Sequence, residues 1–182
     1  MSVNLLHQIF KKVYGKPAWQ VHKGYGSFIT FEFGKPQLRV SKEVLRPRAG
    51  RKWPKYPKRM VRVHGEWHLW IYCCDWEIRQ NDRKIGHSES NDKKIDRACA
   101  VLNGQILTKV VVTPHTLQTD FFFDLGGHLR TTPYQGKPYE MWNIRCPNGR
   151  YFCIRSDGKY TYRPGNTRRN EKHWLPFIFS FQ

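Results

Sequence analysis

The feature of this sequence that most constrains its fold is an internal repeat between its two halves. Phe31–Gly34 and Phe123–Gly126 share the order Phe, acid, apolar residue, Gly, and an apolar helical pattern precedes each motif. A tryptophan-containing strand pattern follows each motif, at Trp67 and at Trp142. Because self-similar units usually pack against one another, the repeat predicts two units around one shared core.

The repeat also predicts where the chain divides. Residues 1–90 form the predicted first unit, with a basic, proline-rich insertion at about residues 44–60, and residues 91–182 form the second. At 182 residues, with 39% apolar and 15% aromatic content, the chain can bury a sizeable core. We therefore expect a strand-dominated α+β fold. Each unit would contain a short helix, an antiparallel β-hairpin and a Trp strand, packed around a shared aromatic core.

The periodicity of apolar residues separates helices from strands. Helical spacing over residues 5–13 and 95–102 predicts two helices that end at Gly15 and Gly104. In most of the remaining sequence, apolar and polar residues alternate in short segments bounded by turn signals, a pattern typical of strands. The predicted strands are a hairpin of 28–33 with 37–40, its counterpart of 119–125 with 128–132, a continuous strand over 61–72, a meander of 142–146, 150–156 and 159–162, and a final core strand within 174–181. If that last segment faces solvent, it is instead an edge for docking another protein.

The charge of the chain is large and uneven. The net charge is +18 and the isoelectric point is near 10.0, which favours a polyanionic or strongly acidic partner. Residues 35–62 contain eleven Lys or Arg residues and one acid, and residues 145–172 contain eight and two. The insertion within the first stretch has three prolines and a glycine between residues 46 and 59, so we predict an extended surface loop.

Aromatic residues stand between the cations of this loop. Trp53 and Tyr56 could stack on bases while the neighbouring cations track phosphates, as single-stranded nucleic acid requires. The alternative is that both rings fold back as apolar anchors and the charges are merely solvated. The predicted nucleic-acid-binding residues are Arg46, Arg48, Arg51, Lys52, Trp53, Lys55, Tyr56, Lys58, Arg59, Arg163, Arg168, Arg169 and Lys172.

No metal site or cofactor is predicted. His64 and His68 fall on the predicted strand 61–72, where residues four apart are separated by about 13 Å and cannot share an ion. The five cysteines form no C-x-x-C pair, and Cys73 and Cys74 are adjacent, which favours reduced thiols and a cytoplasmic location. The N-terminus lacks a signal-peptide pattern and no apolar run is long enough to cross a membrane, so no membrane partner is expected.

Enzymatic motifs are weak. Arg59-x4-His64 and Arg168-x4-His173 are similar in spacing to the catalytic pair of the HEPN ribonucleases, but that family needs a helical bundle. The carboxylates within 75–79, with Asp120 and Asp124, could hold Mg²⁺ in the manner of PD-(D/E)xK nucleases, although Arg79 stands where lysine is expected. A metal-dependent nuclease is therefore the least unlikely enzyme, and no catalytic residue is predicted.

The sequence leaves two functions open. The first is a non-enzymatic binding protein whose basic face docks a polyanion, DNA or RNA. The alternative is an inhibitor, an immunity protein or a complex subunit that covers an acidic partner protein. Both use the same excess of cations, and the residues do not decide between them.

Overall fold

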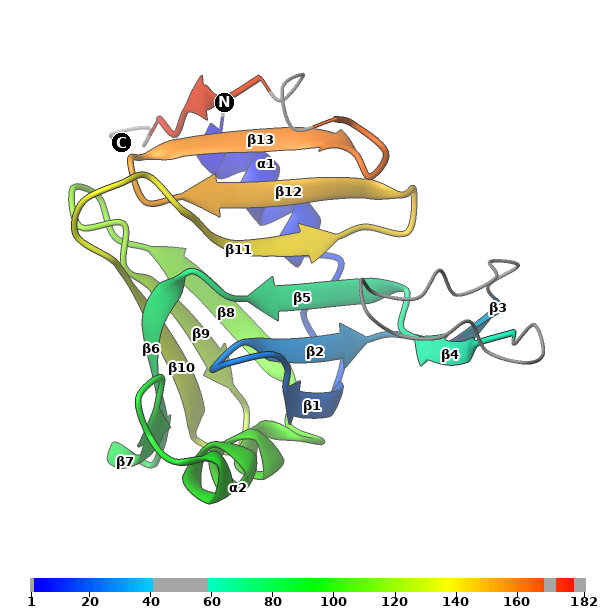
Figure 1. Cartoon of the computed structure of the whole chain (residues 1–182), viewed down its shortest axis with the longest axis vertical. Helices are drawn as coiled ribbons and strands as arrows, with labels where there is room; N and C mark the ends of the chain where they lie inside the picture. Colours follow the sequence, from blue (N-terminus) through cyan, green and yellow to red (C-terminus); the bar gives the residue numbers. More distant parts are fainter. Residues whose placement is uncertain (1, 41–58, 169–172, 179–182) are drawn as a thin grey trace, which may run out of the picture.

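The computed structural model describes residues 2–40, 59–168 and 173–178. These residues form two α-helices and three antiparallel sheets (Figure 1). The helices are α1 (Ser2–Phe10) and α2 (Asp92–Leu102). The expected strand-dominated α+β fold is confirmed.

The largest sheet has seven strands and is assembled from both halves of the chain. Its first three strands come from residues 1–90 and its last four from residues 91–182. In spatial order they are β1 (Ala18–Lys23), β2 (Ile29–Phe33), β5 (Trp67–Ile71), β11 (Glu140–Arg145), β12 (Arg150–Arg155), β13 (Lys159–Pro164) and β14 (Leu175–Pro176).

The second sheet has five strands, and a two-stranded ribbon projects beside the first sheet (Figure 1). The ribbon consists of β3 (Gln37–Val40) and β4 (Val61–His64). The five-stranded sheet is ordered β7 (Arg83–His87), β6 (Cys74–Gln80), β10 (Gly127–Pro133), β9 (Thr119–Phe123) and β8 (Leu107–Val112).

An aromatic core joins the two large sheets, as expected. Phe10 of α1 makes edge contacts with Phe121 of β9 and Trp142 of β11, with ring centroids 6.1 and 6.0 Å apart. Phe31 of β2 stacks on Phe123 of β9 at 6.2 Å. These side chains are buried and come from both halves of the chain, so the halves share one core. The residue-by-residue repeat stays a prediction.

Local sequence signals correctly predicted the positions of most helices and strands. Both predicted helices are present, and Gly15 and Gly104 follow them with φ of +80° and +92°, a backbone region that favours glycine. Asn91 caps α2 by accepting a hydrogen bond from Lys94 N at 3.0 Å. The hairpin β9–β10 and the meander β11–β12–β13 are also confirmed.

The predicted hairpin of 28–33 with 37–40 is wrong. β2 pairs with β1 and β5, whereas β3 pairs with β4 in the projecting ribbon. All four residues of β3 are exposed, while β5 buries Trp67, Leu69 and Ile71 against the core. Pairing β2 with β5 buries more apolar surface than pairing β2 with the short β3 would. Tertiary burial therefore overrides the local turn signal.

The predicted continuous strand over 61–72 is also wrong, because the chain bends at Gly65 and Glu66 between β4 and β5. A Cβ atom at Gly65 would lie 2.5 Å from Phe33 O, so only glycine fits this close approach without movement. At the C-terminal end, Phe177 is buried as expected, but the regular strand is only Leu175–Pro176, and residues 179–181 of the predicted core strand lie outside the described residues.

Candidate functional site

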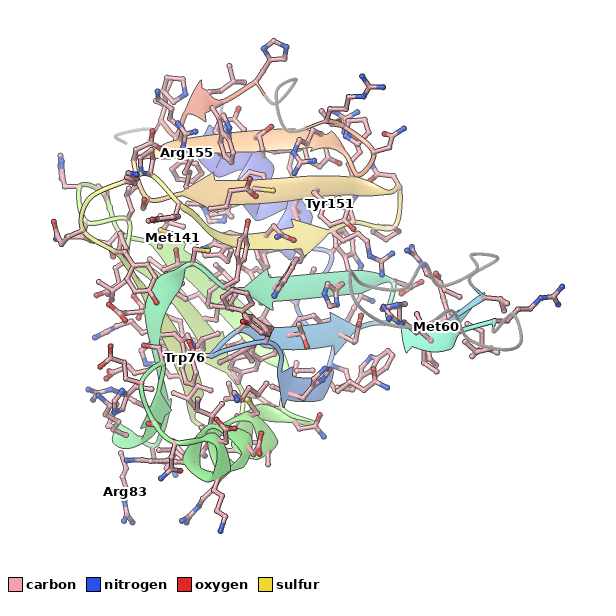
Figure 2. All side chains as sticks on the ribbon, viewed as in Figure 1. Met60, Trp76, Arg83, Met141, Tyr151 and Arg155 are labelled. Atoms are coloured by element: carbon pink, nitrogen blue, oxygen red, sulfur yellow. The ribbon has the colours of Figure 1, made fainter. Side chains whose placement is uncertain are left out.

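The outward face of the seven-stranded sheet carries the candidate site. Side chains alternate along each strand, so β12 places Phe152 and Ile154 in the core and turns Tyr151 and Arg155 to the other face. α1 lies behind β12 and β13 in Figure 1, which leaves the viewer's side of these strands free of the helix. Tyr151 and Arg155 are labelled toward opposite ends of β12 in Figure 2.

A groove of about 630 Å³ is hollowed into this face. Such a volume is in the range of sites that hold small molecules. Its lining combines aromatic rings, two arginines and a few polar groups. The lining residues are Trp70, Tyr72, Cys73, Pro138, Tyr139, Glu140, Asn143, Tyr151, Arg155, Arg163, Gly165 and Trp174.

The aromatic rings on one side of the groove support one another. Trp70 and Tyr72 stack with centroids 4.9 Å apart, and Phe28 packs edge-on against both. Trp70 nevertheless remains 38% exposed. Tyr72 donates its phenol proton to Glu140 Oε2 at 2.5 Å, and burial, followed by the hydrogen bond and charge of Glu140, raises the pKa of Tyr72. The phenol is therefore a protonated donor, and the ring of Trp70 offers a flat apolar surface beside it.

Two polar atoms at the groove lack a hydrogen-bond partner within the described residues. Asn143 is 5% exposed, yet its Oδ1 accepts no hydrogen bond from the described part of the chain, and the buried Nε of Arg163 donates none to it. Buried polar atoms nearly always find a partner, so these two mark positions that a ligand or water can complete. A third such atom, Arg150 Nε, belongs to a side chain whose guanidinium lies 4.6 Å from the centre of the Tyr162 ring.

The arginines of the groove differ in their partners. Arg155 makes a two-pronged ion pair with Asp157, at 2.7 and 2.6 Å, and its guanidinium lies 4.5 Å from the centre of the Trp174 ring. Arg163 makes no ion pair within the described part of the chain. Arg163 is therefore the groove cation whose charge remains available to an anion.

The groove continues into a row of polar residues across the sheet. Successive pairing partners align Glu32, His68, Arg145, Tyr151 and Arg163 on β2, β5, β11, β12 and β13. Neighbouring strands are about 4.8 Å apart, so each residue in the row lies next to the following one. The row therefore links the groove to the first half of the chain.

Arg145 adds buried positive charge to this row. Its Nη2 donates to Gly65 O at 2.9 Å, and the residue is 5% exposed. Burial, followed by the repulsion of Arg39 on the ribbon, lowers the pKa of Arg145. The Glu32 carboxylate acts on Arg145 in the opposite direction, so the two arginines and this one carboxylate leave an excess of positive charge that favours an anion here.

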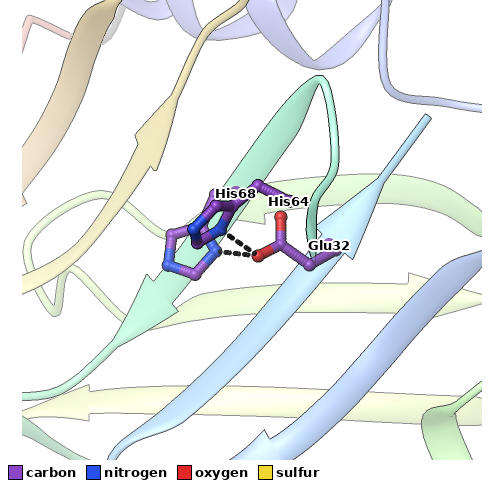
Figure 3. Close-up of side chains that lie close together, drawn as sticks. All are labelled: Glu32, His64 and His68. Carbon is purple, nitrogen blue, oxygen red and sulfur yellow. Dashed lines mark hydrogen bonds and ion pairs between the residues drawn. The ribbon is translucent and has the colours of Figure 1, made fainter. Parts of the chain in front are cut away.

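At the far end of the row, a buried carboxylate meets two imidazoles (Figure 3). The Nδ1 atoms of His68 and His64 lie 2.8 and 3.1 Å from Glu32 Oε1, and Gly65 N donates to Glu32 Oε2 at 2.8 Å. Burial alone would raise the pKa of Glu32, but the hydrogen bonds from His68, Gly65 N and His64 outweigh it and hold the pKa below its usual value. The expectation that His64 and His68 are too far apart to share an ion is wrong: the bend at Gly65 interrupts the strand, and the two ring centroids lie 6.1 Å apart.

Only part of the predicted binding surface falls within the described residues. Arg163 lines the groove, whereas Arg59 and Arg168 are exposed and do not line it. The other predicted binding residues lie outside the described part of the chain; they are Arg46, Arg48, Arg51, Lys52, Trp53, Lys55, Tyr56, Lys58, Arg169 and Lys172.

The carboxylates considered for Mg²⁺ lie on the five-stranded sheet or its connecting turn, and two of them pair with cations. Glu77 contacts Arg79 at 2.6 Å and Lys84 at 3.1 Å. Asp120 accepts hydrogen bonds from Arg130 Nε at 2.8 Å and from His128 Nε2 at 2.7 Å. Because these charges are already balanced, the two carboxylates are better suited to stabilising the sheet than to capturing an ion.

All five cysteines are free thiols. Four are buried and Cys73 is half-buried at the groove. Burial raises the pKa of Cys99 to about 12 and that of Cys146 to about 11, and it also raises the pKa of Cys73. These thiols therefore have little thiolate character at neutral pH.

Comparisons with protein-family models, curated proteins and solved structures found no match. Within residues 2–40, 59–168 and 173–178, no helix combines the length and apolar character needed to cross a membrane.

Proposed function

We propose that this protein binds single-stranded nucleic acid along the groove of the seven-stranded sheet, without catalysing a reaction. The observation that carries the proposal is the composition of the groove: five aromatic side chains lie beside an arginine and an amide oxygen that have no ion-pair or hydrogen-bond partner, respectively, among the described residues. Unstacked bases bind flat rings, and their edges seek polar groups, so this composition suits them.

The position of the charges supports the same ligand. Arg163 and Arg145 lie in one cross-strand row with the Tyr151 ring between them, and Arg39 is close enough to Arg145 to repel it. A phosphate backbone laid along this row would neutralise the like charges while bases enter the groove. The basic stretch at 41–58 connects β3 to β4 in the chain and would supply further phosphate contacts.

A single strand suits the groove better than a duplex. The rings that line the groove can stack only on bases that are not already stacked within a helix. Duplex readers instead insert a helix or ribbon into the major groove and make base-edge contacts there. Asn143 Oδ1, which has no hydrogen-bond partner among the described residues, is suited to accept a hydrogen bond from an exposed base edge.

Fluorescence anisotropy with labelled oligothymidylate and oligouridylate tests the proposal. Trp70→Ala and Tyr151→Ala should each weaken binding by about 1 to 3 kcal/mol, or roughly five- to 150-fold, because each removes a stacking surface. The matched control is Phe122→Ala, which removes an aromatic ring from the other sheet, where Phe122 stacks on His128. Equal losses in all three variants, or no binding by the wild type at low salt, would contradict the proposal.

An acidic protein partner is the second candidate, and the ribbon favours it. Leu38 pairs with Val63 and Val40 with Val61, which places four exposed apolar side chains on one face of β3–β4. Exposed apolar strips beside basic residues are common where proteins dock. A pull-down with this protein as bait tests this candidate. Recovery of an acidic protein in a one-to-one complex without nucleic acid, and loss of that protein in the double variant Leu38→Ser/Val61→Ser, would favour it.

A further inference from the structure

The cluster of Glu32, His64 and His68 has the ligand types and the convergence of a metal site (Figure 3). We propose that these three side chains bind one divalent transition-metal ion, and that Zn²⁺ matches them best. Two imidazole nitrogens with one carboxylate oxygen are a recurrent Zn²⁺ ligand set. The proposal is independent of nucleic-acid binding in the groove.

The distances suit an ion. Glu32 Oε1 lies 2.8 and 3.1 Å from the two Nδ1 atoms, and the three ligand atoms all fall within 4.8 Å of one another. In a tetrahedral site with bonds of about 2.0 to 2.1 Å, neighbouring ligand atoms are about 3.3 Å apart. An ion therefore requires the two imidazoles to withdraw from the carboxylate by a few tenths of an ångström, and the two nitrogens, which lie within 4.8 Å of each other, to take up a similar spacing.

The fold holds the three ligands in place from different elements. Glu32 lies on β2, His68 is its pairing partner on β5, and His64 ends β4. The bend at Gly65 brings His64 back over the sheet, and Gly65 N fixes the second carboxylate oxygen at 2.8 Å. Such an outer hydrogen bond orients a ligating carboxylate and strengthens metal binding.

The surroundings of Glu32 distinguish it from the other buried carboxylate that contacts a histidine. Asp120 is bound by one histidine and by Arg130, whose positive charge already balances it. Glu32 forms ion pairs only with His64 and His68 within the described ranges, and both imidazoles can serve as neutral ligands. The Asp120 cluster thus lacks the second imidazole that a three-ligand site needs.

The site is open on one side. Glu32 is buried, but the side chains of His64 and His68 are 27% and 21% exposed, so an ion can enter from solvent. Three protein ligands leave at least one coordination position for water or another small ligand, as in zinc sites of the open type.

Calorimetric titration of the metal-stripped full-length protein with ZnCl₂ tests this site. We expect one ion per chain in the wild type, and a loss of affinity of more than about a hundredfold in His64→Ala and in His68→Ala, because removing a ligand should exceed the effect of removing an outer partner. His22→Ala and His128→Ala are the matched controls, since each removes a histidine elsewhere, and both should bind as the wild type does.

Two further measurements keep the test decisive if an alanine variant folds poorly. His68→Gln retains a hydrogen-bonding side chain of similar reach but is a poor Zn²⁺ ligand, and it should also lose the ion. Co²⁺ provides a visible spectrum without thiolate bands if the imidazoles and carboxylate bind it. Absence of binding in the wild type, retention of the ion in folded His68→Gln, or thiolate bands that disappear in Cys73→Ser would overturn the proposal.

Discussion

Arg163 is the single residue whose substitution tests nucleic-acid binding in the groove most directly. Its buried Nε has no partner, and within the described residues the side chain forms no ion pair, so its removal leaves no carboxylate uncompensated. We predict that Arg163→Ala weakens binding of oligothymidylate and reduces the slope of log affinity against log salt by about 0.7, the value for one phosphate contact on a single strand.

Arg83→Ala is the matched control for this charge. Arg83 lies on β7, and Figure 2 shows it at the opposite end of the molecule from Tyr151 and Arg155. Anisotropy titrations at several salt concentrations measure both slopes. If Arg83→Ala reduced the slope as much as Arg163→Ala, the cations would act through overall charge and not through the groove.

Asp120 governs a different property, the stability of the five-stranded sheet in acid. Burial would raise the pKa of Asp120, but hydrogen bonds from Arg130, Gln118 and His128 outweigh it and lower the pKa from its ordinary 3.8. A carboxyl with a lowered pKa in the folded state stabilises the fold above about pH 4, and this contribution is lost as the pH falls through the folded-state pKa.

We predict that Asp120→Asn lowers the free energy of unfolding by about 1 to 3 kcal/mol at pH 7, because hydrogen bonds to a charged group are lost. The difference from the wild type should shrink steadily as the pH falls below about 4. Urea denaturation across this pH range measures it. A difference that stayed constant down to pH 2 would show that the charge of Asp120 contributes nothing.

Among the elements, the bend between β4 and β5 has the largest consequence for the candidate sites. It separates the ribbon from the sheet, positions His64, and lets Arg145 donate to Gly65 O at 2.9 Å. Gly65 is the residue that allows this arrangement, since Phe33 O and N lie 2.5 and 2.8 Å from where a Cβ would be.

Gly65→Ala should therefore destabilise the protein by about 1 to 3 kcal/mol, because backbone atoms must move to admit a methyl group. Gly24→Ala is the matched control: its Cβ would meet only ordinary contacts at 3.6 and 3.7 Å, so a change within about 0.5 kcal/mol is expected. Urea unfolding of the two variants compares them directly, and equal effects would contradict a special role for the bend.

At the scale of the whole molecule, elements defined by local sequence signals could be predicted, whereas the pairing of strands far apart in the sequence could not. Helix α2 and the meander β11–β12–β13 were predictable because caps and turn glycines lie within a few residues of the strands and helix they bound. The pairing of β2 with β5 was not, because the turn at Gly34 favours a local hairpin and only the buried face of β5 reveals the better partner.

The candidate sites were harder to predict for the same reason. Asn143 and Trp70 are pairing partners on neighbouring strands yet are 73 positions apart in the sequence. Neither residue belongs to a motif, and only the sheet order places them in one groove. The available signal was the alternation of β5, which assigns Trp70 to the face opposite Leu69 and Ile71 and thus to solvent. Arg163 was predictable from charge alone, whereas the meeting of Glu32 with two histidines required the bend at Gly65.

The seven-stranded sheet therefore carries one continuous row of residues from Glu32 to Arg163, and the part of this row from Arg145 to Arg163 belongs to the proposed nucleic-acid-binding surface. The most direct test of this account is photo-crosslinking of the wild-type protein to an oligonucleotide that carries 4-thiouridine, followed by mass spectrometry of the crosslinked peptides. We predict crosslinks to peptides that contain Trp70, Tyr72 and Tyr151, with or without additional crosslinks in residues 41–58. Crosslinks confined to the five-stranded sheet, or confined to 41–58 with none in the groove, would contradict it.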